Sequence, residues 1–172
     1  RSHLASHENR VCFLFGAGTS AAIKRQDGQP LVPAILGLTV ACHEAVGQLG
    51  KKQSDGWTIL TEECECSGLQ PNVENILSRL RLKIDAAGAA DTPMGMPPAE
   101  PREMEAAIRR TIVKLAAIPD EEIPAQMPHL GFAAWVKNTT RKSAIEVFTT
   151  NYDILLERSL ESLRVPVFDG FV

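Results

Sequence analysis

The sequence has no excess of positive charge and no long apolar run. Its 18 Lys and Arg residues are outnumbered by 21 Asp and Glu residues, which argues against a broad nucleic-acid-binding surface. No segment approaches the roughly 20 consecutive apolar residues that a membrane-spanning helix needs. The polar start, Arg1–Arg10, and the short apolar run after it do not resemble a signal peptide. We therefore expect a cytoplasmic protein that contacts neither membranes nor nucleic acid directly.

Cysteine is also scarce, and its placement does not suggest a disulfide framework. Cys12 falls in a predicted buried strand and Cys42 in a predicted helix, where free thiols behave as small apolar groups. Cys64 and Cys66 form a C-x-C pair, but no second Cys or His pair supplies the remaining ligands of a zinc site. We expect no zinc.

Three apolar segments predict strands. These are residues 10–15, 144–148 and 165–168, and the first is nearly all apolar, as a strand buried on both faces should be. Polar turns follow the first two, Gly16–Ser20 and Thr149–Asp153. Ligands bind beyond the carboxyl ends of the strands in open α/β sheets, so the two turns are expected to meet at one site.

Several helices separate these strands. Apolar residues at helical spacing and flanking Gly and Pro residues predict a loop at 28–33, a polar stretch at 51–56 and a mobile surface loop at 86–101. They predict helices at 34–49, 71–84, 104–115, 129–137 and 154–163. The size and composition suit a single domain over residues 1–172. The order of elements predicts an α/β fold: a Rossmann-like, mostly parallel sheet with a helical insertion over about 34–138.

The glycine turn after the first strand has the composition of a phosphate-binding loop. Gly16 and Gly18 suit a backbone of positive φ that approaches a ligand closely, with Ala17 between them. Thr19 and Ser20 suit a helix cap or donate hydroxyl groups to phosphate. The alternative is a tight strand-to-helix turn without a ligand. The turn lacks the third glycine of the dehydrogenase pattern, which counts against hydride transfer.

The Asn–Asp turn after the second strand has two interpretations. Asn151 and Asp153 are polar groups suited to a site, but Asn and Asp also begin turns and helices. On local grounds, either residue could merely start the helix that follows at Ile154.

The two turns together resemble a known family. Phe13–Ser20, with the sequence FLFGAGTS, and Phe148–Asp153, with the sequence FTTNYD, resemble the sirtuin-like NAD-binding domain. They are closer to its NAD-hydrolysing branch, found in bacterial anti-phage defence proteins such as those of the Thoeris system, than to the deacylases. Val73–Leu77 and Val167–Val172 extend the resemblance over most of the chain. It implies an NAD+ glycohydrolase that depletes NAD+ on activation.

The resemblance also implies roles for individual residues. Asn151 would lie by the nicotinamide ribose and orient a water molecule or a ribose hydroxyl, and Asp153 would hold the carboxamide of the leaving nicotinamide. The residues Gly16, Ala17, Gly18, Thr19 and Ser20 would bind the dinucleotide, with Thr150 at the periphery. Such groups stabilise the oxocarbenium character that develops as the C1′–N bond breaks.

The chain departs from the family in its histidines. The family's histidine follows the Asn–Asp turn and usually precedes Gly, whereas His3, His7, His43 and His129 all precede Asn151 and none is followed by Gly. We interpret His43 as a helix-surface residue and His129 as a cap for the helix after Pro128. We therefore expect the N-terminal part of a longer protein, incomplete at its C-terminus and with little or no activity alone.

Two other functions remain open from the sequence. One is a sensor of NAD+ or ADP-ribose, or an assembly module, without catalysis. The other is an NAD-dependent deacylase, which would need a peptide groove and usually a zinc module. An unfinished sheet would expose an edge or an apolar surface, so we expect a homo-oligomer or contacts with further domains of a longer chain.

Overall fold

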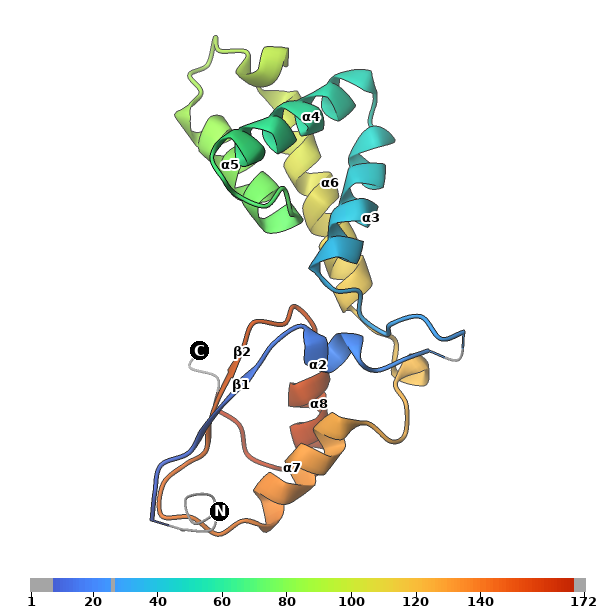
Figure 1. Ribbon diagram of the computed structural model, residues 1–172, viewed down its shortest axis with the longest axis vertical. Helices are drawn as coiled ribbons and strands as arrows, with labels where there is room; N and C mark the ends of the chain where they lie inside the picture. The colour runs from blue at the N-terminus through green and yellow to red at the C-terminus, as the bar shows by residue number, and fades with distance from the viewer. Residues whose placement is uncertain (1–7, 26, 169–172) are drawn as a thin grey trace. The chain divides into compact units, whose positions relative to one another are not determined.

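The computed structural model describes residues 8–25 and 27–168, which divide into two compact units. The strand unit comprises the described residues up to Val32 and from Ala116 onward, and the helical unit is Pro33–Leu115 (Figure 1). The chain is thus mixed α/β, with a two-stranded parallel sheet in the described residues and many helices. The helical insertion was predicted to reach residue 138, but residues 116–138 group with the strands.

The sheet pairs two segments from opposite ends of the sequence. Strand β1 (Cys12–Phe15) lies parallel to β2 (Glu146–Thr149), with Phe15 opposite Thr149. The amide of Thr150 extends the ladder by donating to the carbonyl of Phe15 over 3.0 Å. Both strands therefore end at the same edge of the sheet.

Helices cover one face of this sheet. Phe15 and Val147 pack against buried residues of α7 (Pro128–Asn138) and α8 (Leu155–Ser162), which lie on the same side of the strands (Figure 1). On the other face Leu14 is 75% exposed and Phe148 57% exposed. The prediction that the first strand is buried on both faces is wrong, because in the described residues helices cover only the face that carries Phe15 and Val147, and alternate side chains point to the other face.

The predicted strand at 165–168 is also wrong. These residues have no regular structure and follow α8 after a turn at residues 163–164, where Arg164 has a φ of 56°. The amide of Val165 donates to the carbonyl of Leu160 over 2.9 Å, which closes the end of α8 and turns the chain away from a ladder. The rest of the supporting resemblance, residues 169–172, lies outside the described residues.

A second apolar cluster of the strand unit lies around the loop that follows β1. Leu31 is fully buried there, in the loop predicted at 28–33, beside Ile118 and Leu155. The short helix α2 (Gly18–Ala21) precedes this loop, and the amide of Leu31 donates to the carbonyl of Ile23 over 2.7 Å. The loop therefore fixes the chain just after the glycine turn.

Four helices form the helical unit. They are α3 (Ile35–Gly47), α4 (Lys51–Cys66), α5 (Val73–Ala86) and α6 (Ala99–Ala116). All four contribute to one core, whose buried residues are Leu38, Cys42, Val46, Trp57, Leu60, Cys64, Val73, Ile76, Leu80, Ile84, Met96, Met104 and Ile108. The apolar residues that recur at helical spacing in α5 and α6 are largely those that this core buries.

Helix α5 begins at a polar cap. The side chain of Asn72 accepts a hydrogen bond from the amide of Asn75 over 3.0 Å, as at many helix starts. Pro71, from which the helix was predicted to start, lies just before the cap. The acidic Glu74 lies in the first turn and Lys83 in the last, a distribution that favours the helix dipole.

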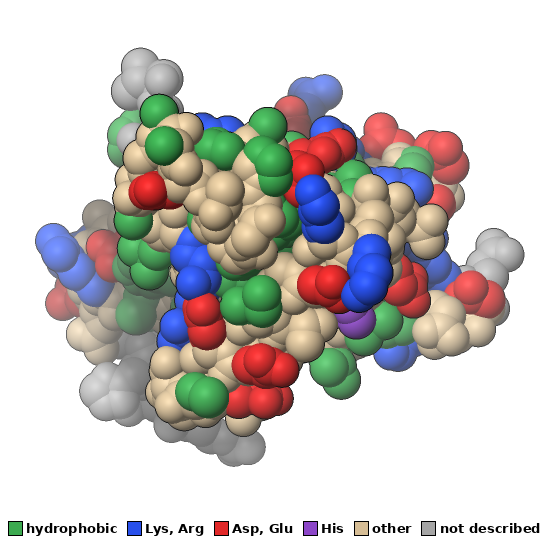
Figure 2. Space-filling view, turned by 90° about the horizontal axis from the view of Figure 1, so that it is seen from above, with side chains coloured by type: hydrophobic (Ala, Val, Ile, Leu, Met, Phe, Trp, Pro, Cys, Tyr) green, Lys and Arg blue, Asp and Glu red, His purple; other side chains and the backbone are tan. Residues whose placement is uncertain are grey.

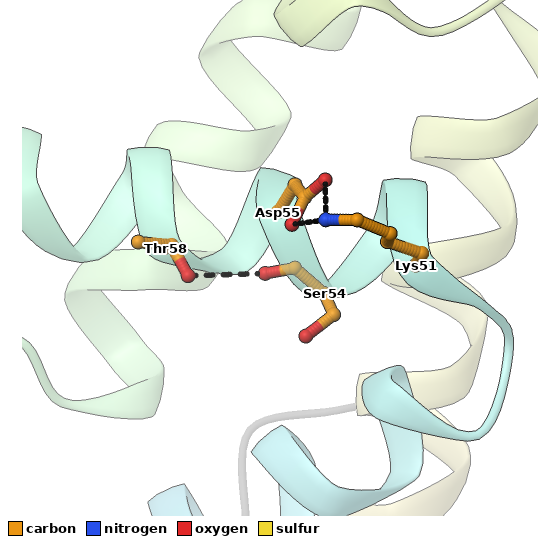
Figure 3. A network of polar contacts seen from close by, with 4 residues as sticks. All are labelled: Lys51, Ser54, Asp55 and Thr58. Atoms are coloured by element: carbon orange, nitrogen blue, oxygen red, sulfur yellow. Dashed lines mark hydrogen bonds and ion pairs between the residues drawn. The ribbon is translucent and has the colours of Figure 1, made fainter.

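The polar stretch predicted at 51–56 is instead the start of α4. Gly50 precedes it at a φ of 146°, a conformation that favours glycine. Gln53 and Trp57 are buried, so one side of these first turns faces the core although most of the residues are polar. On the other side Lys51 contacts Asp55 and the hydroxyl of Thr58 donates to the carbonyl of Ser54 (Figure 3).

The loop predicted at 86–101 is partly built into the core. Pro93–Gly95 forms a 3-10 turn, and the next residue, Met96, is only 1% exposed. The side chains of Met96 and Met104 lie against Gly56, where an added Cβ would be 2.7 Å from the Met96 methyl group. The prediction of a mobile surface loop is therefore wrong for Met96, because its apolar side chain packs against α4.

Thiol chemistry offers a test of this core. Cys42 and Cys64 are buried, and burial raises the pKa of Cys42 to about 11, whereas Cys12 and Cys66 are exposed. Only thiolates react with a disulfide dye, so we expect Cys12 and Cys66 to be labelled first and the buried pair only after unfolding. Counting labelled thiols in the native and denatured chain measures this. Cys66→Ser should remove one fast thiol, and a third fast thiol in the native chain would contradict the packing.

The surface of the helical unit mixes charges of both signs. Ion pairs link Lys52 with Glu100 and Arg81 with Glu105. On the face seen in Figure 2, Lys and Arg side chains stand beside Asp and Glu side chains and do not gather into one basic field. Among the helices described here, none combines the length and apolarity needed to cross a membrane.

Candidate functional site

The two polar turns lie side by side. The side-chain amide of Asn151 donates hydrogen bonds to the hydroxyl of Ser20 over 2.9 Å and to that of Thr19 over 3.2 Å, across 131 and 132 positions of sequence. Parallel strands with aligned ends bring the turns to this edge of the sheet. The structure thus brings together the two turns that the sequence placed at one site.

Local hydrogen bonds fix the Asn–Asp turn. The hydroxyl oxygen of Thr149 accepts from the amide of Asn151 over 3.0 Å, and Thr150, whose side chain is exposed, is held through its amide. Thr150 therefore lies at the end of the ladder with its side chain available at the surface.

The glycine turn is built differently from the prediction. Neither Gly16 nor Gly18 has a positive φ, and an added Cβ at either would meet no atom within 4 Å. Thr19 and Ser20 lie inside α2 and do not cap it, since Ala17 is the N-cap residue and makes no side-chain bond. The Thr19 hydroxyl instead donates to the carbonyl of Gly16 over 2.8 Å.

Gly16 and Gly18 were predicted to allow a positive φ, but their lack of a side chain instead leaves open space at the turn. Because the space around both α-carbons is open, the backbone there is accessible to an approaching molecule. Helix α2 is a single turn of four residues, so we assign no role to its dipole. The predicted binding residues of this turn remain candidates through their backbone, because Ser20 is 1% exposed and the hydroxyl hydrogen of Thr19 is donated to Gly16.

Asn151 has one group without a partner. Its side-chain oxygen, Oδ1, is buried and accepts no hydrogen bond from any residue that the structure describes, although its amide nitrogen is used twice. A buried acceptor without a partner costs about 1–3 kcal/mol, and native proteins rarely leave one. A hydroxyl or N–H donor of a bound ligand would satisfy it.

Asp153 is the buried carboxylate of the site. It is 7% exposed, and its Oδ1 accepts from the amide of Leu155 over 3.1 Å, two residues later. The local alternative from the sequence therefore holds in part, because Asp153 does organise the start of α8. Its second oxygen has no part in that bond.

His129 also belongs to this region, and the sequence analysis missed it. Its ring is 2% exposed and stacks on Phe15, with ring centroids 6.1 Å apart and an angle of 29° between the planes. Both ring nitrogens are buried without a hydrogen-bond partner among the described residues. The prediction that His129 caps its helix is wrong, since Met127 is the N-cap residue of α7.

Burial decides the charge state of His129. Desolvation lowers the pKa of His129 below 6.5, and the nearby carboxylates of Asp153 and Glu157 oppose this without reversing it. The imidazole is therefore neutral at pH 7. It offers one donor and one acceptor to its surroundings.

Because His129 is buried in its neutral form, we expect the free energy of unfolding to fall in acid. As pH falls, the unfolded chain binds a proton at this residue before the folded chain does, so the stabilisation present above about pH 6.5 is lost below it. We expect the free energy of unfolding to fall less for His129→Phe than for the unaltered chain between about pH 7.5 and about pH 5.5. Urea unfolding at both pH values measures this, with His43→Phe as the control. Equal losses in the two variants would contradict the assignment.

The other polar features of the strand unit are less suited to a site. An open groove of about 540 Å³ is lined by residues including Ile123, Met127 and Arg158, but none of the turn residues lines it. Arg158 is already bound to Asp120 and to the carbonyl of Ile118. No buried polar atom of a residue lining this groove lacks a partner in the part of the chain that the structure describes.

The remaining histidines and cysteines do not join the turns. His43 stacks on Trp57 in the helical unit, and His3 and His7 lie outside the described residues. Cys64 is buried in the core while Cys66 is exposed. Over residues 8–25 and 27–168, no three His, Cys, Asp or Glu side chains are grouped so that they could hold a metal ion.

Compared with protein-family models and with curated proteins, the sequence matches none. The polar groups of the candidate site are Asn151, Asp153, Thr19 and Ser20, and His129 of α7 stacks on Phe15 at the end of β1.

Proposed function

We propose that this chain binds NAD+ at the two turns and hydrolyses it to nicotinamide and ADP-ribose, with the low activity expected of a sequence that has no histidine after Asn151. The observation that carries the proposal is the bridge from Asn151 to Ser20 and Thr19, which joins the FTTNYD and FLFGAGTS motifs into one polar site. The finer fold is part of the same proposal: a Rossmann-like sheet of which β1 and β2 are two parallel strands. In the resembling family, such hydrolysis depletes NAD+ during anti-phage defence.

The unsatisfied groups of the site support a polar ligand of this kind. The free Oδ1 of Asn151 requires a donor, and a ribose hydroxyl or an attacking water is one. Open backbone at Gly16 and Gly18 leaves room for a diphosphate at the glycine turn. The ligand would therefore place its ribose at the Asn–Asp turn and its phosphates at the glycine turn.

The chemistry needs few groups. The C1′–N bond of the nicotinamide riboside breaks, nicotinamide leaves with the bonding electrons, and water adds to C1′ with release of a proton. Asn151 would orient the water or a ribose hydroxyl through its free oxygen. Asp153, a carboxylate beside the developing positive charge, would stabilise it and hold the carboxamide of the leaving group.

Nicotinamide release is the test. The chain is incubated with NAD+, and free nicotinamide and ADP-ribose are quantified by chromatography while binding is followed by calorimetry. Equal amounts of the two products would support hydrolysis, and an acetylated peptide added in parallel would reveal a deacylase by forming acetyl-ADP-ribose. Failure to bind NAD+ or ADP-ribose would overturn the proposal.

Gly18→Ala provides a sharper test of where the phosphates lie. The new methyl group meets no protein atom and replaces Gly in a helical turn, so stability should stay equal or rise. The same methyl group would occupy space that we assign to the ligand, and we expect roughly tenfold weaker NAD+ binding, equivalent to about 1.4 kcal/mol. Gly131→Ala in α7, which also meets no atom within 4 Å, is the control. Unchanged binding by Gly18→Ala would exclude this placement.

One observation favours a second function, a sensor that binds NAD+ or ADP-ribose without cleaving it. Asp153 is buried and bonded to the start of α8, and His129 is buried as well. Neither is placed at the surface as a ready general base. Binding without any nicotinamide release would favour the sensor.

A further inference from the structure

His129 reaches the site from an element that neither motif includes. It lies in the first turn of α7, and its ring stacks on Phe15, the last residue of β1. Leu155, whose amide donates to the carboxylate of Asp153, lies in the same apolar cluster as Met127 and Leu130, the residues two before and one after His129. The carboxylates of Asp153 and of Glu157, in the first turn of α8, both act to raise the pKa of His129. A histidine between the end of a strand and a site carboxylate is well placed to act on that carboxylate.

The ring is buried at a cost that packing alone does not explain. Both nitrogens lack a partner in the described part of the chain, although a phenylalanine would fill a similar volume against Phe15 without this penalty. Hydrogen bonds of functional groups are often long or absent before a ligand binds and form in the complex. The unpartnered nitrogens therefore point to a bond that the occupied site completes.

We propose that His129 is a positioning residue for Asp153: when ligand fills the site, a ring N–H of His129 donates a hydrogen bond to the carboxylate and fixes its orientation. An ionised carboxylate only accepts, and the neutral ring carries a single N–H, so the tautomer with that N–H toward Asp153 is the one used. The amide of Leu155 takes one acceptor site of Oδ1, and the remaining lone pairs of the carboxylate are left to accept the ring N–H. The ligand, NAD+, rests on the proposed function, whereas the pairing of the two side chains does not.

Imidazole titration by nitrogen-15 NMR tests, before any ligand is added, whether the carboxylate of Asp153 lies close enough to His129 to pair with it. Asp153→Asn keeps the acceptor for the Leu155 amide but removes the negative charge, so the pKa of His129 should fall further. Glu157→Gln should lower it less, since Asp153 is the stronger of the two carboxylate influences. Signals are assigned by loss in His129→Phe, with His43→Phe as the second assignment variant. No change in Asp153→Asn, or a larger change in Glu157→Gln, would overturn the pairing.

Comparison of stability with affinity then separates positioning from packing. His129→Phe keeps a ring on Phe15 but has no N–H, and we expect an equal or higher melting temperature with roughly tenfold weaker NAD+ binding. His129→Gln retains an N–H and should bind within about threefold of the unaltered chain. A lower melting temperature for His129→Phe with unchanged binding would show a packing role and overturn the proposal.

The two proposals fail in different ways. If the unaltered chain does not bind NAD+, the proposed function fails, and the NMR titration alone decides whether His129 and Asp153 are paired. If the chain binds NAD+ and His129→Phe binds equally well, the positioning role fails while the proposed function stands.

Discussion

Replacing Asn151 with alanine should reduce the rate of nicotinamide release by roughly 100-fold or more, the usual effect of removing one precisely placed polar group from a site that stabilises developing charge. The substitution removes the oxygen proposed to orient water or ribose and the amide that bonds Ser20 and Thr19. The turn itself should persist, because the backbone amide of residue 151 still donates to Thr149. Initial rates at saturating NAD+ measure the effect.

The matched control for this variant is Asn138→Ala. Asn138 is exposed at the end of α7, where its side chain donates only to the carbonyl of Ala134. Its loss should leave the rate within a factor of about two, as expected for a surface position. If Asn151→Ala released nicotinamide as fast as Asn138→Ala, the Asn–Asp turn would have no part in the chemistry.

The largest effect on stability is expected for Leu60→Ala. Leu60 is fully buried in the core of the helical unit, and removing a leucine side chain from such a site costs about 3 kcal/mol. The total free energy of unfolding of a small domain is only a few times this value, so the helical unit of this variant should unfold at low urea concentration. Urea unfolding followed by the helical circular-dichroism signal measures the loss.

Leu82→Ala is the control for this variant, because it makes the same chemical change on a helix of the same unit. Leu82 is 69% exposed on α5 and should change the free energy of unfolding by no more than about 0.5 kcal/mol. Similar losses for the two variants would mean that α4 does not pack as described.

The sequence predicted the helices whose apolar residues repeat regularly. In α5, Val73, Ile76, Leu80 and Ile84 recur at helical spacing and all are buried. The start of α4 was missed because its buried side includes Gln53 and Gly56, neither of which an apolar pattern reveals. The fit of Gly56 against Met96 and Met104 depends on residues far along the chain, which local patterns do not contain.

The strands were predicted from their apolar composition, but their environment was not. An apolar run such as Cys12–Phe15 is typical of a strand covered on both sides. Coverage depends on how many helices reach each face, and in the described residues α7 and α8 pack on the face of Phe15 and Val147. The exposed apolar side chains of Leu14 and Phe148 therefore follow from tertiary structure alone.

Of the candidate site, the sequence predicted the two turns but not His129. Asn151 and the glycine turn follow strands, so the rule that sites lie at strand ends brought them together. His129 follows no strand and has no motif, and its burial against Phe15 became apparent only from the packing of α7. The pattern Pro128-His129 before an amphipathic helix suggested a cap and carried no signal of a site.

The bond between Asn151 and Ser20 also has a consequence for the order of folding. The helical unit consists of consecutive residues and can form by closing short loops, whereas β1 and β2 meet only after a loop of more than a hundred residues has closed. Collapse of Pro33–Leu115 into a folded body shortens the flexible part of that loop and lowers the entropy lost on closure. The polar site should thus be among the last parts of the molecule to form. A partly folded chain would contain the helices of Pro33–Leu115 but not yet the bond between Asn151 and Ser20.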